Sequence, residues 1–356
     1  MLHTPGIGGK TYLSLLDRVG SPRTVFQESR SALTHLGLKS ATVDAILKPD
    51  WDRVNKDLSW LEAPGRHLLA ITDETYPPLL REIPDPPPVL FVNGSVEILH
   101  LPQIAIVGSR NPSKLGLSTA YDFAATLACS RIATTSGLAL GIDAAAHQGS
   151  LNARFPTIAV TGTGLDRVYP ARHHELACNI STNGALVSEF PPGTVAKANH
   201  FPRRNRIIAG LSLGTLVVEA AIQSGSLITA RLALEQGREV FAIPGSIHNP
   251  LSRGCNALIR QGAKLVETVE DIFEELGQFQ NTNTLDNQQP KAVQLQFQLD
   301  EDHADLLKNI GQEPTSVDTL IVKMGLPPES VASMLLILEL EGYISSAAGG
   351  CYYRLS

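Results

Sequence analysis

The chain has 356 residues, of which 43% are hydrophobic and 18% charged, so it is not a wholly disordered protein, and its length predicts two or three domains. Its net charge of −6 is unevenly distributed: residues 101–270 carry fifteen basic and ten acidic side chains, whereas residues 301–356 carry three and eight. A basic middle and an acidic end indicate different partners. No apolar run is long enough to cross a membrane, and the four cysteines form no CxxC pair, so we expect a protein of the reducing cytoplasm without a disulfide framework or a cysteine zinc site.

Residues 1–65 are predicted to form a small helical module, because apolar residues recur there at helical spacing. The turn at residues 5–10, Pro-Gly-Ile-Gly-Gly-Lys, precedes the first helix. It resembles a helix-hairpin-helix turn, whose backbone amides can meet a DNA phosphate. The pattern is short, so a plain capping turn is the favoured alternative.

Residues 66–100 contain two proline clusters, at 77–78 and 86–88. Repeated proline fixes an extended backbone and opposes helix formation. We therefore expect a rigid connector that is laid over the next domain.

Short β-rich runs then alternate with helical stretches as far as about residue 270. The runs cover residues 104–107, 131–134, 157–160, 185–188, 215–218 and 239–242. Nearly continuous apolar strands separated by helices predict a parallel sheet that is covered on both faces. The sequence thus predicts a doubly wound α/β domain over residues 66–275, whose ligands bind at the carboxyl ends of the strands.

The C-terminal part is predicted to be a winged-helix domain at residues 299–356, after a flexible Gln- and Asn-rich linker at 276–298. Three helical stretches, near residues 302–310, 316–323 and 329–341, precede two β-rich runs that form a hairpin. The negative charge of this domain makes it a poor match to duplex DNA, since like charges repel. We expect a protein-contact or regulatory role instead, including competition with DNA for the basic surface.

The loops that follow the predicted strands are consistently rich in small residues. Small residues let backbone amides approach an anion, and helix N-termini favour its charge. Several such loops at one sheet edge predict a phosphate-binding surface, although each loop alone is also explained as a tight turn. The residues concerned are Gly108, Ser109, Arg110, Ser136, Gly137, Gly162, Gly225 and Ser226.

Arg110 is the candidate phosphate ligand in these loops. The dinucleotide fingerprint G-x-G-x-x-G and a P-loop lysine are both absent after the first strand of the α/β domain. An arginine in the turn can bind a phosphate through two parallel hydrogen bonds. A surface ion pair is the alternative.

Residues 197–206 carry four positive charges, no acid and one aromatic ring. Basic side chains with an interleaved aromatic suit single-stranded nucleic acid, because the charges follow the backbone and a ring stacks on a base. The alternative is a solvated basic loop with the ring in the core. The last arginine leads directly into an apolar helix, so we expect it to be fixed there. The predicted contacts are Lys197, Phe201, Arg203, Asn205 and Arg206.

Asp143 and His147 share one helix face, as an acid/base or metal-binding pair would. A helix-dipole role for Asp143 and a local partner for His147 explain the pair better. His173 and His174 are adjacent and point apart on a helix, so we expect no shared metal, and we expect Cys178 to be buried. No nucleophile–base arrangement is present, and we predict no catalytic residue, metal or cofactor.

Four of these motifs resemble, in order, those of the DNA-processing protein A family, DprA or Smf. They are residues 108–110, 136–147, 201–208 and 224–230, and the similarity runs from about residue 66 to 270. The resemblance implies an extended Rossmann-like domain that binds single-stranded DNA without catalysis. It also implies a homodimer that places the recombinase RecA on incoming single strands during natural transformation.

Carried over by position, the resemblance implies that Arg110 grips a phosphate beside the amides of Gly108 and Ser109, and that Phe201 lines the path of the strand. The family typically has a lysine just before that phenylalanine. Here the nearest is Lys197, so the second cationic contact is Lys197 or Arg203.

A small-nucleotide enzyme is the alternative function. Rossmann-like relatives resembling cytokinin-activating phosphoribohydrolases carry the signature G-G-x-G-T-x-x-E. Residues 210–219 keep Gly214 and Thr215 but shift the glutamate by one, to Glu219. The basic residues 197–206 favour a polymer over a nucleotide.

Overall fold

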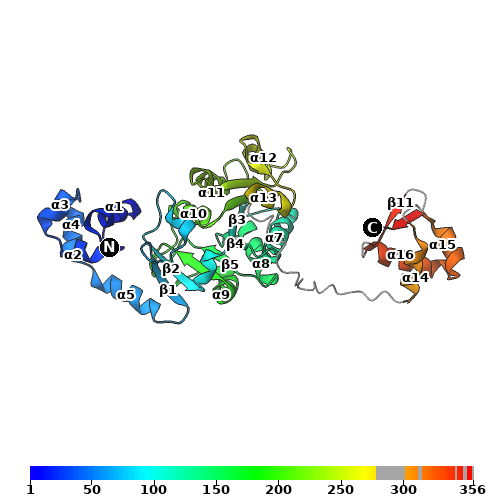
Figure 1. Ribbon diagram of the computed structural model, residues 1–356, viewed down its shortest axis with the longest axis horizontal. Coiled ribbons are helices and arrows are strands. Elements are labelled where there is room, and N and C mark those ends of the chain that lie inside the picture. The colour runs from blue at the N-terminus through cyan, green and yellow to red at the C-terminus, as the bar shows by residue number, and fades with distance from the viewer. Residues whose placement is uncertain (278–300, 312–314, 341–342, 348–350, 355–356) are drawn as a thin grey trace. The chain divides into compact units, whose positions relative to one another are not determined.

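The computed structural model describes residues 1–277, 301–311, 315–340, 343–347 and 351–354. It divides into two compact units, Met1–Asn281 and Thr282–Ser356 (Figure 1). The predicted linker from residue 278 onward lies outside the described residues, and so does the turn of the predicted C-terminal hairpin.

The first unit begins with five helices, in agreement with the predicted helical module. They are α1 (Gly9–Val19), α2 (Pro22–Gln27), α3 (Arg30–His35), α4 (Ser40–Leu47) and α5 (Trp51–Leu61). Ser21 and Ser29 cap α2 and α3, because each side chain accepts a hydrogen bond from the backbone amide three residues later. The first four helices share a small apolar core that includes Leu33 and Ile46.

The glycine turn before α1 packs against the proline-rich segment. A Cβ atom at Gly9 would lie 2.7 Å from the carboxylate oxygen Oδ1 of Asp85 and 2.9 Å from the carbonyl oxygen of Pro86. Glycine is therefore needed for this close approach. Because a carboxylate stands beside the turn and would repel a phosphate, the geometry favours a packing role over a DNA contact.

The proline-rich segment is part of the sheet, so the expected connector laid over the next domain is wrong. The strand β1 (Arg66–Ala70) pairs antiparallel with β2 (Val89–Gly94). Between them in the chain lies α6 (Pro78–Arg81), and the short helix η1 (Glu97–His100) follows. Proline does not exclude a helix at α6, because it occupies the first turn, where a backbone N–H has no helical partner to lose.

Nine strands form one sheet in the order β1-β2-β6-β5-β4-β3-β7-β8-β9. All neighbours from β6 to β9 are parallel, whereas β1 and β2 add an antiparallel edge. The further strands are β3 (Gln103–Gly108), β4 (Ala133–Ser136), β5 (Thr157–Val160), β6 (Ala185–Ser188), β7 (Gly214–Val218), β8 (Glu239–Ala242) and β9 (Lys264–Leu265). All six predicted strands are present; β4 begins two residues late because Arg131 turns with φ of 60°.

Helices cover both faces of this sheet, which confirms the doubly wound arrangement (Figure 1). Alternate residues of β3 point to opposite faces. Ile104 and Ile106 pack with α7 and α8, whereas Ala105 and Val107 pack with α10 and α11. The helices are α7 (Lys114–Cys129), α8 (Ile142–Asn152), η2 (Ala171–His173), α9 (His174–Asn183), α10 (His200–Leu211), α11 (Gly225–Glu235), α12 (Arg253–Arg260) and α13 (Val269–Leu276).

The second unit has the predicted winged-helix arrangement of three helices and a hairpin. Its elements are α14 (Glu301–Asn309), β10 (Thr315–Ser316), α15 (Val317–Met324), α16 (Pro328–Leu340), β11 (Ile344–Ala347) and β12 (Cys351–Arg354). The strands form a sheet in the order β10-β12-β11. Its core is apolar and includes Leu306, Leu320 and Leu335.

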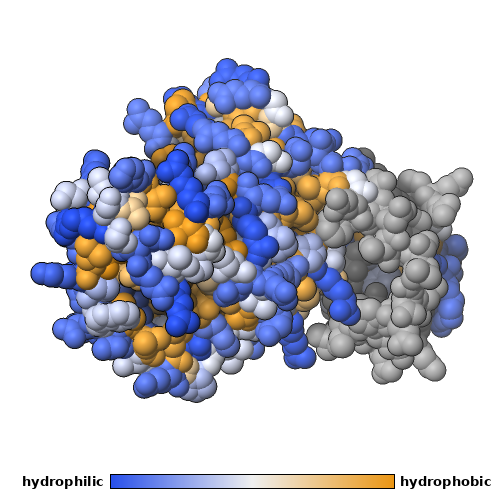
Figure 2. Space-filling view, turned by 60° about the vertical axis from the view of Figure 1, so that its left-hand side comes forward, coloured by the Kyte–Doolittle hydropathy of each residue, from blue (hydrophilic) through white to orange (hydrophobic). Residues whose placement is uncertain are grey.

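The outer surface mixes polar and apolar side chains. Figure 2 shows hydrophilic residues interspersed with smaller hydrophobic areas on the face turned to the viewer, which is the usual composition of a folded protein surface. Within the described ranges, no helix combines the length and the apolar character that a membrane span requires.

Replacing Leu80 tests whether the proline-rich segment belongs to the core. Leu80 is fully buried on α6 and packs against Gly210 of α10, where a Cβ atom would lie 2.8 Å from its Cδ1. Truncating a buried leucine costs about 2–5 kcal/mol, so we expect Leu80→Ala to lower the free energy of unfolding by this amount. Urea unfolding followed by tryptophan fluorescence reports on the unit that contains Leu80, because both tryptophans lie in that unit.

The matched control is Leu68→Ala, at an exposed leucine of β1. A loss at Leu80 as small as at this control, within about 0.5 kcal/mol as at ordinary surface positions, would contradict the assignment of the segment to the core.

Candidate nucleic-acid interface

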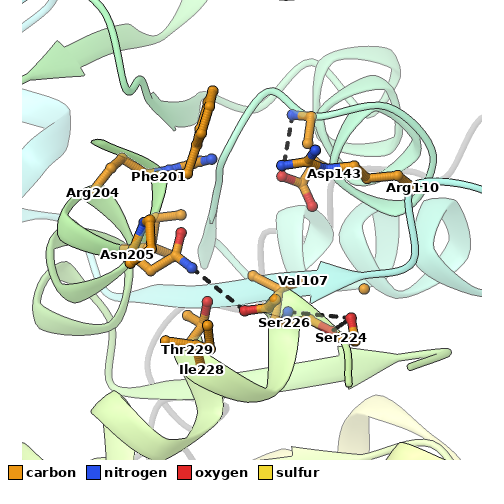
Figure 3. Close-up of a pocket in the computed structure, with 15 residues that line it drawn as sticks. Val107, Arg110, Asp143, Phe201, Arg204, Asn205, Ser224, Ser226, Ile228 and Thr229 are labelled. Carbon is orange, nitrogen blue, oxygen red and sulfur yellow. Dashed lines mark hydrogen bonds between the residues drawn. The ribbon is translucent and has the colours of Figure 1, made fainter. Parts of the chain in front are cut away.

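The carboxyl ends of β3 and β7 lie side by side at the point where the chain connections turn to opposite sides of the sheet. The strand β3 lies between β4 on one side and β7 on the other. The connections that leave β3 and β7 therefore separate at this edge, and open α/β sheets bind their ligands in such a crevice. A cavity of about 370 Å³ lies there, between the end of β3 and the first turns of α10 and α11 (Figure 3).

Six of the thirteen predicted contact residues line this cavity, although they lie on three segments that are far apart in the sequence. Asn205 joins two of these segments, because its Nδ2 donates to the carbonyl oxygen of Gly225 at 3.5 Å (Figure 3). Ser224 caps α11 by accepting the N–H of Ser226 at 3.3 Å. The six residues are Gly108, Arg110, Phe201, Asn205, Gly225 and Ser226.

The end of β3 is shaped by packing of the chain against itself. A Cβ atom at Gly108 would overlap with the carbonyl oxygen of Val218. The Ser109 amide donates to the carbonyl oxygen of Glu219 at 2.8 Å. That amide is therefore engaged within the protein, whereas the Arg110 side chain is exposed and can meet a phosphate.

Arg110 and Phe201 form one wall of the cavity. The Arg110 guanidinium carbon lies 5.6 Å from the centroid of the Phe201 ring, a cation–π distance. Phe201 is half-buried and rests on Gly162, where a Cβ atom would lie 3.1 Å from the ring. Arg110 is exposed, and no carboxylate in the described part of the chain forms an ion pair with it. The alternatives of a surface ion pair for Arg110 and a core position for Phe201 are thus not what the structure contains.

A smaller cavity of about 50 Å³ adjoins the first and shares Arg110, Phe201 and Arg204 with it. Tyr169 contributes to its lining, and the centroid of its ring lies 5.6 Å from that of Phe201. Gly137 also lines this cavity.

Arg204 belongs to the site and was not among the predicted contacts. It is only 4% exposed, it lines both cavities, and its Nη1 donates to the carbonyl oxygen of Val160 at 3.0 Å. Burial lowers the pKa of Arg204 to about 10, against the opposing effect of Asp143, so the guanidinium stays charged at neutral pH. The available sequence signal was helical spacing, because Arg204 follows Phe201 by three residues and shares its helix face.

Asp143 holds the loop after β4 in place. Its Oδ2 accepts the amide hydrogens of Gly137 at 3.1 Å and of Ala139 at 3.2 Å. A Cβ atom at Gly137 would overlap with the guanidinium of Arg204, so the loop, the acid and the arginine pack as one group. Burial raises the pKa of Asp143, while Arg204 and the two amides act in the opposite direction. These contacts agree with the structural role that the sequence favoured for Asp143.

Two of the predicted cationic contacts are held by an internal acid. Arg206 is buried, as its position before an apolar helix indicates; its Nη2 donates to Glu189 at 2.6 Å and its Nη1 to the carbonyl oxygen of Asp85 at 2.6 Å. Arg203 donates to the same Glu189 oxygen at 2.9 Å, although its side chain is 57% exposed. Lys197 is exposed and has no ion pair among the residues the structure describes.

The remaining predicted residues lie inside the protein or away from the cavities. The Ser136 hydroxyl is fully buried and donates to the carbonyl oxygen of Ile106 at 2.6 Å, and Gly162 is buried beneath Phe201. Cys178 is exposed, with its sulfur 3.8 Å from Nδ1 of His174, so the expectation of a buried thiol is wrong. Over the described ranges, no cluster of three His, Cys, Asp or Glu residues could hold a metal ion.

His147 is a buried neutral histidine with a local partner. The Thr157 hydroxyl donates to the carbonyl oxygen of Thr134 at 2.7 Å, so its oxygen accepts the hydrogen on Nδ1 of His147 at 2.8 Å. The other ring nitrogen, Nε2, is buried without a partner among the described residues. A proton there would meet no acceptor, and burial lowers the pKa of His147 to about 3.

Comparison with known proteins covers both units. Residues 67–277 match the family model of DNA recombination-mediator protein A, and residues 290–350 match that of the DprA winged helix domain. Protein Smf of Escherichia coli is 47% identical over 331 residues, which are 91% of this chain and 86% of that protein.

Two solved structures are similar to this chain. The X-ray structure of DNA processing protein A from Streptococcus pneumoniae matches with a TM-score of 0.69 and 39% identity, and covers 77% of this chain and 95% of that one. The second, DNA processing protein A from Helicobacter pylori, has been described for its single-stranded DNA binding mode. It matches with a TM-score of 0.54 and 29% identity, over 59% of this chain and 95% of that one.

Replacing His147 is expected to make the fold less sensitive to acid. A histidine in the unfolded chain titrates near pH 6.5, whereas the pKa of folded His147 is about 3. Between these values the unfolded chain binds more protons, so the free energy of unfolding falls as the pH is lowered, by about 2 kcal/mol from pH 7 to pH 5. In urea unfolding at both pH values, His147→Gln should lose less stability than the original chain.

The control is His248→Gln, at an exposed histidine, which should keep the original dependence on pH. If His147→Gln and His248→Gln lose the same stability between pH 7 and pH 5, the buried neutral imidazole is not what makes the fold sensitive to acid.

Proposed function

Because this chain belongs to the DNA recombination-mediator protein A family, DprA or Smf, we propose that it binds single-stranded DNA at the cavity between β3 and α11. The bound strand would follow the carboxyl edge of the sheet, where the loops after β3, β4 and β7 meet. The single-stranded DNA binding mode of the Helicobacter pylori relative supports this choice of polymer.

The observation that carries the proposal is the exposed Arg110 guanidinium beside the half-buried Phe201 ring. A guanidinium binds a backbone phosphate without regard to sequence, and a partly exposed ring stacks on an unpaired base. In a duplex the bases are already stacked on one another, so the ring would find no partner. Together the two groups favour a single strand over a duplex.

The same proposal includes the biological role that the family resemblance implies. The protein would hold incoming single strands in the cytoplasm and pass them to the recombinase RecA during natural transformation, and it would act as a homodimer. A candidate surface for the homodimer contact lies at the open β9 edge of the sheet. The exposed apolar residues Ile222, Ile247 and Leu265 border a cavity of about 470 Å³ there.

The acids near the site favour binding without catalysis over the phosphoribohydrolase-like alternative. The Glu219 carboxylate accepts both the amide and the hydroxyl of Ser113, the residue that caps the N-terminus of α7. Asp143 is likewise occupied by two amides. These hydrogen bonds give both acids a structural role in the loops around the cavity, which supports the choice of binding without catalysis.

Deleting residues 293–356 is expected not to weaken the binding of a short duplex. The segment 301–356 carries three basic and eight acidic residues, so its electrostatic contribution to phosphate binding is unfavourable. Fluorescence anisotropy with a labelled duplex measures the effect. A sharp loss of duplex binding on deletion would contradict the protein-contact or regulatory role of this domain.

Replacing Arg110 tests the main proposal. Arg110→Ala should weaken the binding of all oligonucleotide sequences to a similar extent. The slope of log K against log salt should become smaller in magnitude by about 0.7–1, which corresponds to the loss of one phosphate contact. Lys197→Ala should have a similar effect, whereas Arg203→Ala should have a smaller one because Glu189 already holds that side chain.

The control is Arg231→Ala, at an exposed arginine of α11 that lines neither cavity. A sequence-selective loss for Arg110→Ala, or no loss at all, would count against the proposal. Excess nucleoside monophosphate should not displace oligothymidine, and the release of a free base from a nucleotide would support the enzyme alternative.

A further inference from the structure

Tyr169 is a large aromatic side chain that the fold leaves half in solvent. It lies in the segment between β5 and α9 and is 49% exposed. Its hydroxyl has no hydrogen-bond partner among the described residues. Its ring packs against Phe201, with the centroids 5.6 Å apart and the ring planes inclined by 40°. Neither burial nor hydrogen bonding explains a tyrosine at this position.

The ring borders a site that already carries positive charge. The smaller cavity is lined by Tyr169, Phe201, Arg110 and Arg204. All of these residues except Tyr169 also line the larger cavity. The Arg110–Phe201 wall is thus common to both cavities. A strand whose phosphate is held by Arg110 has the Phe201 ring within reach, and the Tyr169 ring is the next one along this surface.

The exposure of Tyr169 decides how a base would meet it. The ring is 49% exposed, so a base can lie on its open face without entering the smaller cavity. The 5.6 Å between the two ring centroids also exceeds the roughly 3.4 Å rise per nucleotide along one strand of a double helix. The pair of rings thus fits successive bases that are not stacked on each other.

We propose that Tyr169 is a second base-stacking residue, and that the bound single strand crosses the Arg110–Phe201 wall to reach it. This inference rests on the proposed function, because it needs a strand at Phe201. It assigns to Tyr169 a contact with the base, not with the phosphate. A stacking contact of this kind tolerates every sequence, because each base has a π-face.

The first test compares four proteins in anisotropy titrations with oligothymidine over a series of salt concentrations. Tyr169→Ala should bind about tenfold more weakly, which is within the range for the loss of one stacked base. Its salt slope should equal that of the original chain, because no phosphate contact is lost. Tyr169→Phe should keep full affinity, since the hydroxyl has no partner. Trp51→Ala, which removes a 62% exposed ring on α5, is the matched control and should also bind normally.

The second test asks whether the base is what Tyr169 contacts. On an oligomer of abasic nucleotides, Tyr169→Ala and the original chain should bind equally. A Tyr169→Trp variant should show quenching of its additional tryptophan fluorescence when oligothymidine binds. The signal of the two native tryptophans, measured on the original chain, is subtracted.

The outcomes separate this inference from the proposed function. If Tyr169→Ala binds oligothymidine as the original chain does while Arg110→Ala binds more weakly, the inference is wrong and the proposed function stands. The inference is also wrong if Tyr169→Ala changes the salt slope or weakens binding to the abasic oligomer equally. If the original chain does not bind oligothymidine at all, the proposed function itself fails.

Discussion

The position of β3 between β4 and β7 is the constraint on which the site depends. Parallel strands end at the same edge, so the segments after β3, β4, β5 and β7 begin there even though they span more than a hundred residues of sequence. The divergence of the chain on either side of β3 then opens the cavity. Arg110 comes to this cavity from the loop after β3, and Ser226 comes from the helix after β7. Neither residue would line the cavity without that register.

Burial decides which of the arginines near this edge are available to a ligand. Arg206 is locked between Glu189 and the backbone at Asp85, and its removal from water is compensated only because these partners are in place. Arg204 is equally buried and lies beside Asp143, yet it borders both cavities, so its charge would contribute to the binding of an anion there without direct exposure to solvent. Arg110 is exposed and free of acids among the described residues. A count of positive charges along residues 197–206 therefore overstates the number of cationic groups that can contact a ligand directly.

The sequence was sufficient for six strands of the parallel sheet because most of them are short apolar runs between helices, and burial on both faces produces that pattern; the two-residue strand β9 (Lys264–Leu265) is too short to give it. It failed at residues 66–100, because proline chemistry constrains single residues and says little about which strand they pair with. Besides β1, the strand β2 pairs with β6, which lies more than ninety residues later. The site was predictable in part. Arg110 and Phe201 were identified from local chemistry, whereas the pairing of Glu189 with Arg203 and Arg206 is a long-range contact that no local pattern records. Tyr169 was missed for the same reason, since its significance comes from Phe201, thirty-two residues away.

A site built from one exposed guanidinium and partly exposed rings suits the proposed function, in which the protein passes the bound strand on. A guanidinium bound to a phosphate and rings stacked on bases would make no hydrogen bonds to base edges, so every position on the strand would be equivalent. The affinity of one chain for the strand would come from few contacts, and its phosphate contribution would weaken as the salt concentration rises. In the proposed homodimer, a second copy of the site would raise the overall affinity through effective concentration without strengthening either contact. A recombinase that advances along the strand could then displace these contacts one at a time. A strand enclosed in a deep groove could leave only after the whole groove had opened.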